Sequence, residues 1–266
     1  MTCEEQKNAD RFTGFADVYD SARPSVPLYP VQIVVNYLDK TPDRVVDLGC
    51  GTGLSTLIWK EHAKEVVGIE PSDDMRAVAE QKKAENVRFE KGFGNKIPLE
   101  NESADAVICS QSFHWMEPKS TLAEVNRILK PNGVFLTVDC DWPPVIDWRA
   151  EKLYMDLYGK IKKLEKDFDD VSDTFVRYSK DKHLENIKAS GYFRYAREIV
   201  FTNEEPCTAK RLCDLLLSQG STQILLKLHP EMIKKDIDDF CAKVHELLGD
   251  KTYSAGFCYR MRIGVK

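Results

Sequence analysis

The chain has 266 residues and a formal net charge of −5, which argues against broad binding to nucleic acid or to an anionic membrane. Hydrophobic residues make up 42% and charged residues 30% of the chain, as in a folded globular protein rather than a disordered one. No apolar run approaches the roughly 20 residues of a membrane-spanning helix, and the first residues lack the features of a signal peptide. We therefore expect a cytoplasmic protein without a membrane partner.

Up to about residue 140, short apolar strands alternate with helical patterns. Strands are expected at residues 44–48, 65–69, 86–90, 104–109 and 134–138. Helices are expected at 54–63, after Ser72, and over the stripe from Leu122 to Leu129, which ends at the turn Lys130-Pro131-Asn132-Gly133. This alternation predicts an α/β fold whose parallel sheet is covered on both faces.

The second half of the chain is more helical. A helix is expected through Leu153 and Leu164, another at 184–190, and two or three between Cys207 and Leu248. A sixth strand is expected at 198–201 and a last one at 255–265. We interpret these helices as a cover over the functional site. The eight cysteines form no Cys-x-x-Cys pair, so we expect reduced thiols and no metal site.

A glycine loop, Asp47-Leu48-Gly49-Cys50-Gly51-Thr52-Gly53, connects the first strand to the next helix. Glycines permit a tight turn there and let a ligand lie against the backbone and the helix N–H groups. Glu70 ends the second strand, where a carboxylate can accept hydrogen bonds from both ribose hydroxyls of a nucleoside. The alternative interpretation is an ordinary strand–helix turn followed by an exposed glutamate.

The loop favours one nucleoside cofactor over another. The dinucleotide fingerprint would place its third glycine at position 54, which is Leu54 here. Asp47, two residues before Gly49, would repel a pyrophosphate but suits a ligand with an ammonium and a sulfonium. The loop therefore favours S-adenosylmethionine over NAD.

These motifs resemble a known family. The glycine loop resembles motif I of class I S-adenosylmethionine-dependent methyltransferases, residues 67–72 resemble the next motif, and residues 127–134 resemble the loop before the fifth strand. Residues 15–24 and Phe113-His114-Trp115 are similar to the trans-aconitate methyltransferase-like group. The resemblance implies a Rossmann-like, doubly wound, mainly parallel seven-stranded sheet with a helical cover inserted around strand six. It also implies methyl transfer to a small molecule.

The same resemblance implies that the chain is one methyltransferase domain made of four segments. Residues 1–40 would form N-terminal lid helices, 41–138 the cofactor-binding core, 139–253 the cover with strand six, and 254–266 the final strand.

Roles for the cofactor-binding residues follow from the resemblance. Asp47, Gly49 and Gly51 would face the methionine part, and Glu70 would hold the ribose. The other positions expected to contact the cofactor are Tyr19, Arg23, Phe93, Gly94, Ser110 and Gln111. Arg23 would pair with the methionine carboxylate. Many relatives have an acid after the glycine that follows strand three; this chain has Gly92-Phe93-Gly94, so adenine would contact backbone groups and the ring of Phe93.

The sequence indicates the residues that would bind the methyl acceptor less specifically than those that would bind the cofactor. His114 is the candidate catalytic base, although it could instead pack beside Trp115, and an ionised carboxylate acceptor would need no base. Four aromatic residues could line or cap the acceptor pocket or belong to the core: Trp142, Trp148, Tyr154 and Tyr158. The stretch Ser110-Gln111-Ser112-Phe113 lacks the proline-containing tetrad of enzymes that methylate base amino groups, which disfavours a nucleic-acid substrate.

The favoured function is methyl transfer to oxygen, including carboxylate oxygen, by direct displacement. Two alternatives remain open. One is a binding module that holds S-adenosylmethionine without turnover, and the other is an NAD(P)-dependent oxidoreductase.

Overall fold

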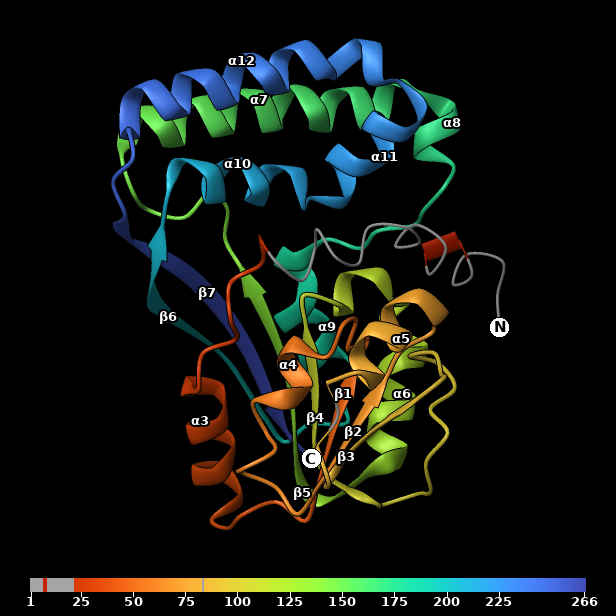
Figure 1. Cartoon of the computed structure of the whole chain (residues 1–266). Coiled ribbons are helices and arrows are strands. Elements are labelled where there is room, and N and C mark those ends of the chain that lie inside the picture. Colours follow the sequence, from red (N-terminus) through yellow and green to blue (C-terminus); the bar gives the residue numbers. More distant parts are fainter. Residues whose placement is uncertain (1–6, 9–21, 83) are drawn as a thin grey trace.

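A computed structural model describes residues 7–8, 22–82 and 84–266 of the chain. One sheet forms the centre, with strand order β3-β2-β1-β4-β5-β7-β6 (Figure 1). The strands are β1 (Arg44–Leu48), β2 (Glu65–Ile69), β3 (Val87–Glu90), β4 (Ala104–Ser110), β5 (Leu129–Cys140), β6 (Tyr195–Cys207) and β7 (Tyr253–Val265). β1 to β5 are parallel, and β7 runs antiparallel to both β5 and β6. The predicted Rossmann-like, mainly parallel seven-stranded sheet is confirmed.

The near-continuous apolar strands supply two cores, one on each face of the sheet. Val45 and Val66 belong to one buried cluster, whereas their chain neighbours Val46 and Val67 belong to the other. Successive strand residues point to opposite faces, so a strand buried on both faces must be apolar at every position. Burial on both faces fixes the positions of the strand ends. The glycine loop follows the end of β1, and Glu70 follows the end of β2.

Helices lie around the sheet and above one end of it. The helices are α3 (Tyr29–Leu38), α4 (Leu54–Leu57), α5 (Asp73–Glu80), α6 (Pro118–Ile128), α7 (Trp148–Asp167), α8 (Asp169–Ser172), α9 (His183–Ala189), α10 (Ala209–Leu217), α11 (Gly220–Leu228) and α12 (Pro230–Leu248), with the short 3-10 helices η1 (Phe113–Trp115) and η2 (Lys180–Lys182). Long helices α7 and α12 pack against each other above α10 and α11 (Figure 1). These four helices lie within residues 139–253, for which a substrate cover was expected, and we call them the cover.

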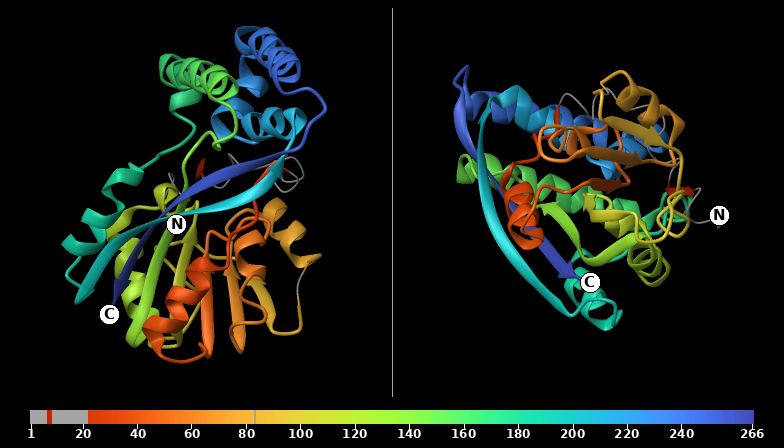
Figure 2. Two further views of the ribbon diagram at one scale, coloured as in Figure 1. Left: turned by 90° about the vertical axis from the view of Figure 1, so that its left-hand side faces the viewer. Right: turned by 90° about the horizontal axis from the view of Figure 1, so that it is seen from below.

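The cover has an apolar core of its own. Tyr154 of α7 is fully buried, and its ring lies 6.1 Å from that of Phe240 on α12. Buried residues Ile161, Ile237 and Val244 continue this contact along both helices. Strands β6 and β7 are both long and extend from the sheet to the cover (Figure 2).

Several element boundaries differ from the sequence prediction. α4 ends at Leu57, and turns replace the helix expected up to residue 63. β6 has 13 residues where only 198–201 were expected. Its extra residues include Asn203 and Pro206, which an edge strand tolerates because one side needs no ladder partner. The expected turn at Lys130–Gly133 lies within the span of β5, where the pairing with β4 shifts register.

Helix α3, from the expected N-terminal lid, packs beside the sheet against β5. In the described part of the chain, the cysteines are free thiols and no helix combines the length and apolar character needed to cross a membrane.

Candidate cofactor and acceptor site

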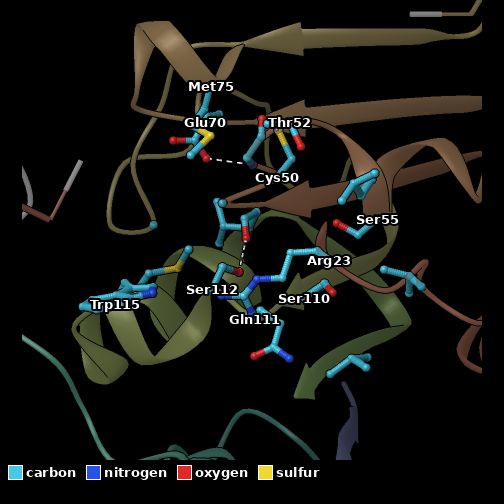
Figure 3. A pocket seen from close by; sticks show the side chains of 18 of the residues that line it. Arg23, Cys50, Thr52, Ser55, Glu70, Met75, Ser110, Gln111, Ser112 and Trp115 are labelled. Carbon is cyan, nitrogen blue, oxygen red and sulfur yellow. Dashed lines mark hydrogen bonds between the residues drawn. The ribbon is translucent and has the colours of Figure 1, made fainter. Parts of the chain in front are cut away.

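A pocket opens at the carboxyl ends of β1, β2, β4 and β5 (Figure 3). The cover helices lie above this edge of the sheet (Figure 1). Its lining comes from the glycine loop, the end of β2, the segment after β4, and more distant residues of β5 and β7. Ligand sites of open parallel sheets lie at this edge, where strand order reverses between β1 and β4. The pocket is therefore the candidate functional site.

The glycine loop needs its glycines for two different reasons. Gly49 and Gly51 have left-handed φ values of 72° and 56°. A Cβ on Gly49 would lie 2.6 Å from the Cβ of Ser112, so the segment after β4 packs directly against this backbone. A Cβ on Gly51 would meet no atom within 4 Å, although Gly51 lines the pocket. The first glycine allows packing, and the second keeps the pocket open.

Glu70 forms a buried acidic wall of the pocket. Its side chain accepts hydrogen bonds from the backbone N–H groups of Gly51 and Ser72, each at 2.9 Å. Burial raises the pKa of Glu70 to about 7, although these two hydrogen bonds oppose the rise. Figure 3 shows Glu70 beside Thr52 and Met75, on the side of the pocket away from Gln111. The carboxylate thus lies where the sequence predicted an acceptor for ribose hydroxyls.

Asp47 supports the loop from behind and does not itself line the pocket. Its Oδ2 accepts hydrogen bonds from the hydroxyls of Ser55 at 2.6 Å and Thr56 at 2.7 Å. Its Oδ1 is buried and has no hydrogen-bond partner among the described residues. Burial raises the pKa of Asp47 to about 6. The predicted contact with a bound methionine group would therefore pass through the loop and Ser55, which does line the pocket.

The raised pKa of Asp47 predicts a pH-dependent stability difference. Wild-type protein should lose stability as the pH rises from about 4 through about 6, because the folded state disfavours the ionised carboxylate. The Asp47→Asn variant keeps an oxygen that can accept the hydrogen bonds of Ser55 and Thr56. Because its amide does not ionise, its stability should not fall in this way as the pH rises. The free energy of unfolding of Asp47→Asn relative to wild type should therefore rise by about 2 kcal/mol between pH 4 and pH 7. Urea unfolding across this range checks it, with exposed Asp250→Asn as control; parallel pH curves for wild type and Asp47→Asn would contradict it.

The remaining predicted cofactor residues are mostly brought together. Arg23, Phe93, Gly94, Ser110 and Gln111 all line the pocket. Tyr19 lies outside the described residues.

Arg23 also joins the N-terminal segment to the cover. Its Nη2 donates to the backbone oxygen of Ser218 at 2.9 Å and to Oε1 of Gln219 at 3.3 Å. Its guanidinium lies 5.0 Å from the ring centroid of Trp142. Arg23 thus connects the pocket lining to the cover, a contact that the sequence did not predict.

His114 does not line the pocket. Its imidazole is buried, and Nδ1 lies 3.8 Å from Oδ1 of Asp139, on the side facing His183. Burial and the nearby Lys180 hold the pKa of His114 well below its ordinary value, although Asp139 opposes this. A buried neutral imidazole outside the pocket matches the packing alternative, so its position provides no support for the predicted role as a base.

Of the four aromatic residues expected near the acceptor, one lines the pocket, namely Trp142. Trp148 is 73% exposed, and Tyr154 and Tyr158 pack within the cover. Sequence reasoning missed several pocket residues: Trp115, Met116, Cys140 and Tyr259. Tyr259 comes from the last strand, and only the pairing of β7 with β5 brings it there. No local motif could have indicated it.

The pocket fits an adenosyl group with a charged amino-acid tail. Glu70 offers an acceptor for ribose hydroxyls, and Gly51 leaves open space beside it. Pro71, Met75 and Phe93 supply apolar surface for an adenine ring near that carboxylate. The buried, partly unpartnered carboxylate of Asp47 adds negative charge behind the loop, which favours a cationic ligand.

Comparisons with known proteins agree with this geometry. Residues 46–137 match the family model described as a methyltransferase domain. An uncharacterized methyltransferase of Mycobacterium bovis is 34% identical over 133 residues, which cover 50% of this chain and 53% of that protein. A probable S-adenosylmethionine-dependent methyltransferase of Saccharomyces cerevisiae is 34% identical over 123 residues, covering 44% of this chain and 42% of the relative. The match thus spans about half the length of these relatives.

Solved structures show the fold over most of the chain. A structure from Anaeromyxobacter dehalogenans named as a type II methyltransferase aligns with a TM-score of 0.69 and 17% identity, over 91% of this chain and 97% of that one. Another, from Anabaena variabilis and named as a methyltransferase from an antibiotic biosynthesis pathway, aligns with a TM-score of 0.61 and 16% identity, over 91% and 98% of the two chains. Residues 46–137 are therefore similar to a methyltransferase domain, and most of the chain shares the fold of these solved structures.

Proposed function

We propose that the protein transfers the methyl group of S-adenosylmethionine to an oxygen atom of a small molecule, with a carboxylate as the favoured acceptor. The observation that carries this proposal is one pocket that joins the glycine loop and Glu70 at one side to Cys140, Trp142 and Tyr259 at the other. Arg23, which also lines it, connects this pocket to the cover by its hydrogen bond to Ser218. The first side suits the cofactor, and the covered side suits an acceptor small enough to be enclosed. The resemblance to the trans-aconitate methyltransferase-like group supports the same assignment.

The chain's residues would hold and align the two reactants. Glu70 would accept the ribose hydroxyls, and Gly49 and Gly51 would contact the methionine part. Phe93 and Gly94 would contact adenine. The sulfonium of the cofactor supplies an already activated methyl group, so the protein mainly orients the acceptor and excludes water.

The ionisable residues of the lining favour an acceptor that needs no base. Among the described residues these are Arg23, Cys50, Glu70, Cys140 and Tyr259. Burial raises the pKa of Cys140 to about 12 and holds the pKa values of Cys50 and Tyr259 well above their ordinary ranges. Glu70 lies on the proposed ribose side. An acceptor already ionised at neutral pH, such as a carboxylate, can react without proton removal.

Two further expectations belong to this proposal. The helical cover, together with the net charge of −5, favours a small-molecule acceptor over a nucleic acid. Residues 139–253 would act as the substrate cover, and the free thiols of the described residues fit work in the cytoplasm.

A radiolabel assay tests the proposal directly. Purified protein is incubated with methyl-labelled S-adenosylmethionine and a panel of small mono-, di- and tricarboxylic acids, with the corresponding primary amides and total RNA as alternatives. We expect label in one or more acids, released by mild base as expected for a methyl ester. Label in RNA alone would contradict the proposed substrate class. Cofactor binding without transfer to any acceptor would instead support the binding-module alternative.

A further inference from the structure

A lysine of the short helix η2 contacts a side chain of the pocket. Nζ of Lys180, in η2, lies 2.7 Å from Oε1 of Gln111 and 3.0 Å from Oδ1 of Asp139. Lys180 does not itself line the pocket, whereas Gln111 does. The backbone N–H of Tyr178 donates to the backbone oxygen of His114 at 2.8 Å, which holds the segment before Lys180 against η1. Lys180 is therefore placed to act on the pocket through Gln111.

Asp139 fixes the position of the lysine. It is 3% exposed, and its Oδ2 contacts Arg262 at 3.0 Å and His183 at 3.1 Å. These contacts leave Oδ1 facing Lys180. Burial opposes ionisation, but Lys180 and His183 nevertheless hold the pKa of Asp139 below its ordinary value. The charged carboxylate thus anchors the ammonium beside Gln111.

This contact determines which way the amide of Gln111 points. An ammonium group only donates hydrogen bonds, so the amide atom facing Lys180 must be the oxygen. The backbone is fixed as well, because Gln111 has a φ of 55° and its N–H donates to the backbone oxygen of Val138 at 2.8 Å. Among the described residues, the hydrogen bond made by the Gln111 side chain is the one to Lys180, through Oε1. The NH2 group is left as a hydrogen-bond donor for a ligand.

The position of Gln111 places its NH2 group on the side expected for the methyl acceptor and away from the side expected for the ribose. Glu70 follows β2, whereas Gln111 follows β4, and β1 with its glycine loop lies between these strands. Figure 3 shows Glu70 and Gln111 on opposite sides of the pocket. A cofactor whose ribose contacts Glu70 would extend across the glycine loop, so its reactive end would point toward the Gln111 side.

We propose that Lys180 is a positioning residue that turns the amide N–H donors of Gln111 toward the acceptor, and that the acceptor is held there through a carboxylate oxygen. This inference rests on the proposed function, because it assigns the acceptor side of the same pocket. The carboxylate that Gln111 binds would be either the one that is methylated or a second carboxylate of the same molecule. Arg23 and Trp142 line the same pocket and would enclose the acceptor.

The test compares lysine variants with wild type. The substrate is the carboxylic acid that the radiolabel screen identifies as most rapidly methylated. Lys180→Met removes the ammonium but keeps an unbranched side chain, and Lys180→Arg keeps a group that only donates. Lys182→Met is the matched control, because Lys182 lies in the same short helix and pairs with Glu185 at the surface. For each variant, KM and kcat are measured for the acid, and calorimetry gives the Kd of the acid for protein saturated with S-adenosylhomocysteine.

Lys180→Met should raise both KM and this Kd by about 10-fold or more, because the amide can then turn its oxygen toward the carboxylate. Its kcat and its Kd for S-adenosylmethionine should stay within about 2-fold of wild type. Lys180→Arg should recover most of the loss, and Lys182→Met should match wild type. Gln111→Leu should raise the KM for the acid at least as much as Lys180→Met. This variant supplies a second test if Lys180→Met unfolds.

Three outcomes would overturn the inference. An unchanged KM for the acid in Lys180→Met would contradict the positioning role. A loss of kcat and of cofactor affinity as large as the loss of affinity for the acid would indicate a general structural role. A protein that binds S-adenosylmethionine and methylates primary amides but no acid would exclude the carboxylate. Failure to bind S-adenosylmethionine would contradict the proposed function itself, so the two failures are distinguishable.

Discussion

Replacing Glu70 by alanine should weaken S-adenosylmethionine binding by about 100-fold or more. The wild-type carboxylate would accept hydrogen bonds from two ribose hydroxyls, and a hydrogen bond to a charged group contributes about 1.5–3 kcal/mol. The same carboxylate orders the loop, since it accepts the N–H groups of Gly51 and Ser72. Calorimetric titration of wild type and Glu70→Ala with S-adenosylmethionine measures the effect.

Glu85→Ala is the matched control for this prediction, because Glu85 is exposed and lies outside the pocket lining. It should bind the cofactor with wild-type affinity. Circular dichroism should show that Glu70→Ala keeps its secondary structure at the temperature of the titration. Unchanged affinity in folded Glu70→Ala would remove Glu70 from the cofactor site.

Replacing Gly51 by alanine should strongly weaken cofactor binding while the protein remains folded. The new Cβ would meet no protein atom within 4 Å, so it would project into open space at the pocket wall. Left-handed backbone costs a non-glycine residue about 1–2 kcal/mol, which is the expected loss of stability. A methyl group in the space of the methionine part should raise the Kd by about 100-fold or more. Calorimetry and urea unfolding measure the two effects separately.

Gly191→Ala separates strain from obstruction. Gly191 also has a left-handed φ, 73°, and a Cβ there would likewise meet no atom within 4 Å, but it lies outside the pocket lining. The two variants should lose similar stability, and only Gly51→Ala should lose cofactor affinity. Equal affinity in both variants would show that the cofactor does not lie against Gly51.

Local sequence patterns predicted the parallel part of the fold because its strands are short, apolar and separated by clear helix signals. Val45 and Val46 serve opposite cores, so the whole strand is apolar and easy to recognise. The edge strand β6 was underestimated because exposed positions in it carry polar residues such as Thr202 and Glu204. Its length follows from pairing with β7, which is a non-local property.

The candidate site also has one part that local sequence patterns predicted and another that depends on non-local packing. Gly49, Gly51 and Glu70 were predictable because one loop and one strand end require particular residue types. The acceptor side is assembled from distant segments, and the contact between Lys180 and Gln111 joins residues 69 positions apart. His114 occupies a position from which a base was expected, yet its side chain points into the cluster around Asp139. That surrounding is non-local, since the ring of His183 in α9 lies 6.5 Å from the ring of His114.

The central claim is that the glycine loop and Glu70 bind S-adenosylmethionine. Calorimetric titration of the purified wild-type protein with S-adenosylmethionine, S-adenosylhomocysteine and NAD tests it most directly. We expect saturable binding of the first two ligands, at one molecule per chain, and no binding of NAD. Binding of NAD alone would contradict the assignment of the pocket and the proposed methyl transfer that depends on it.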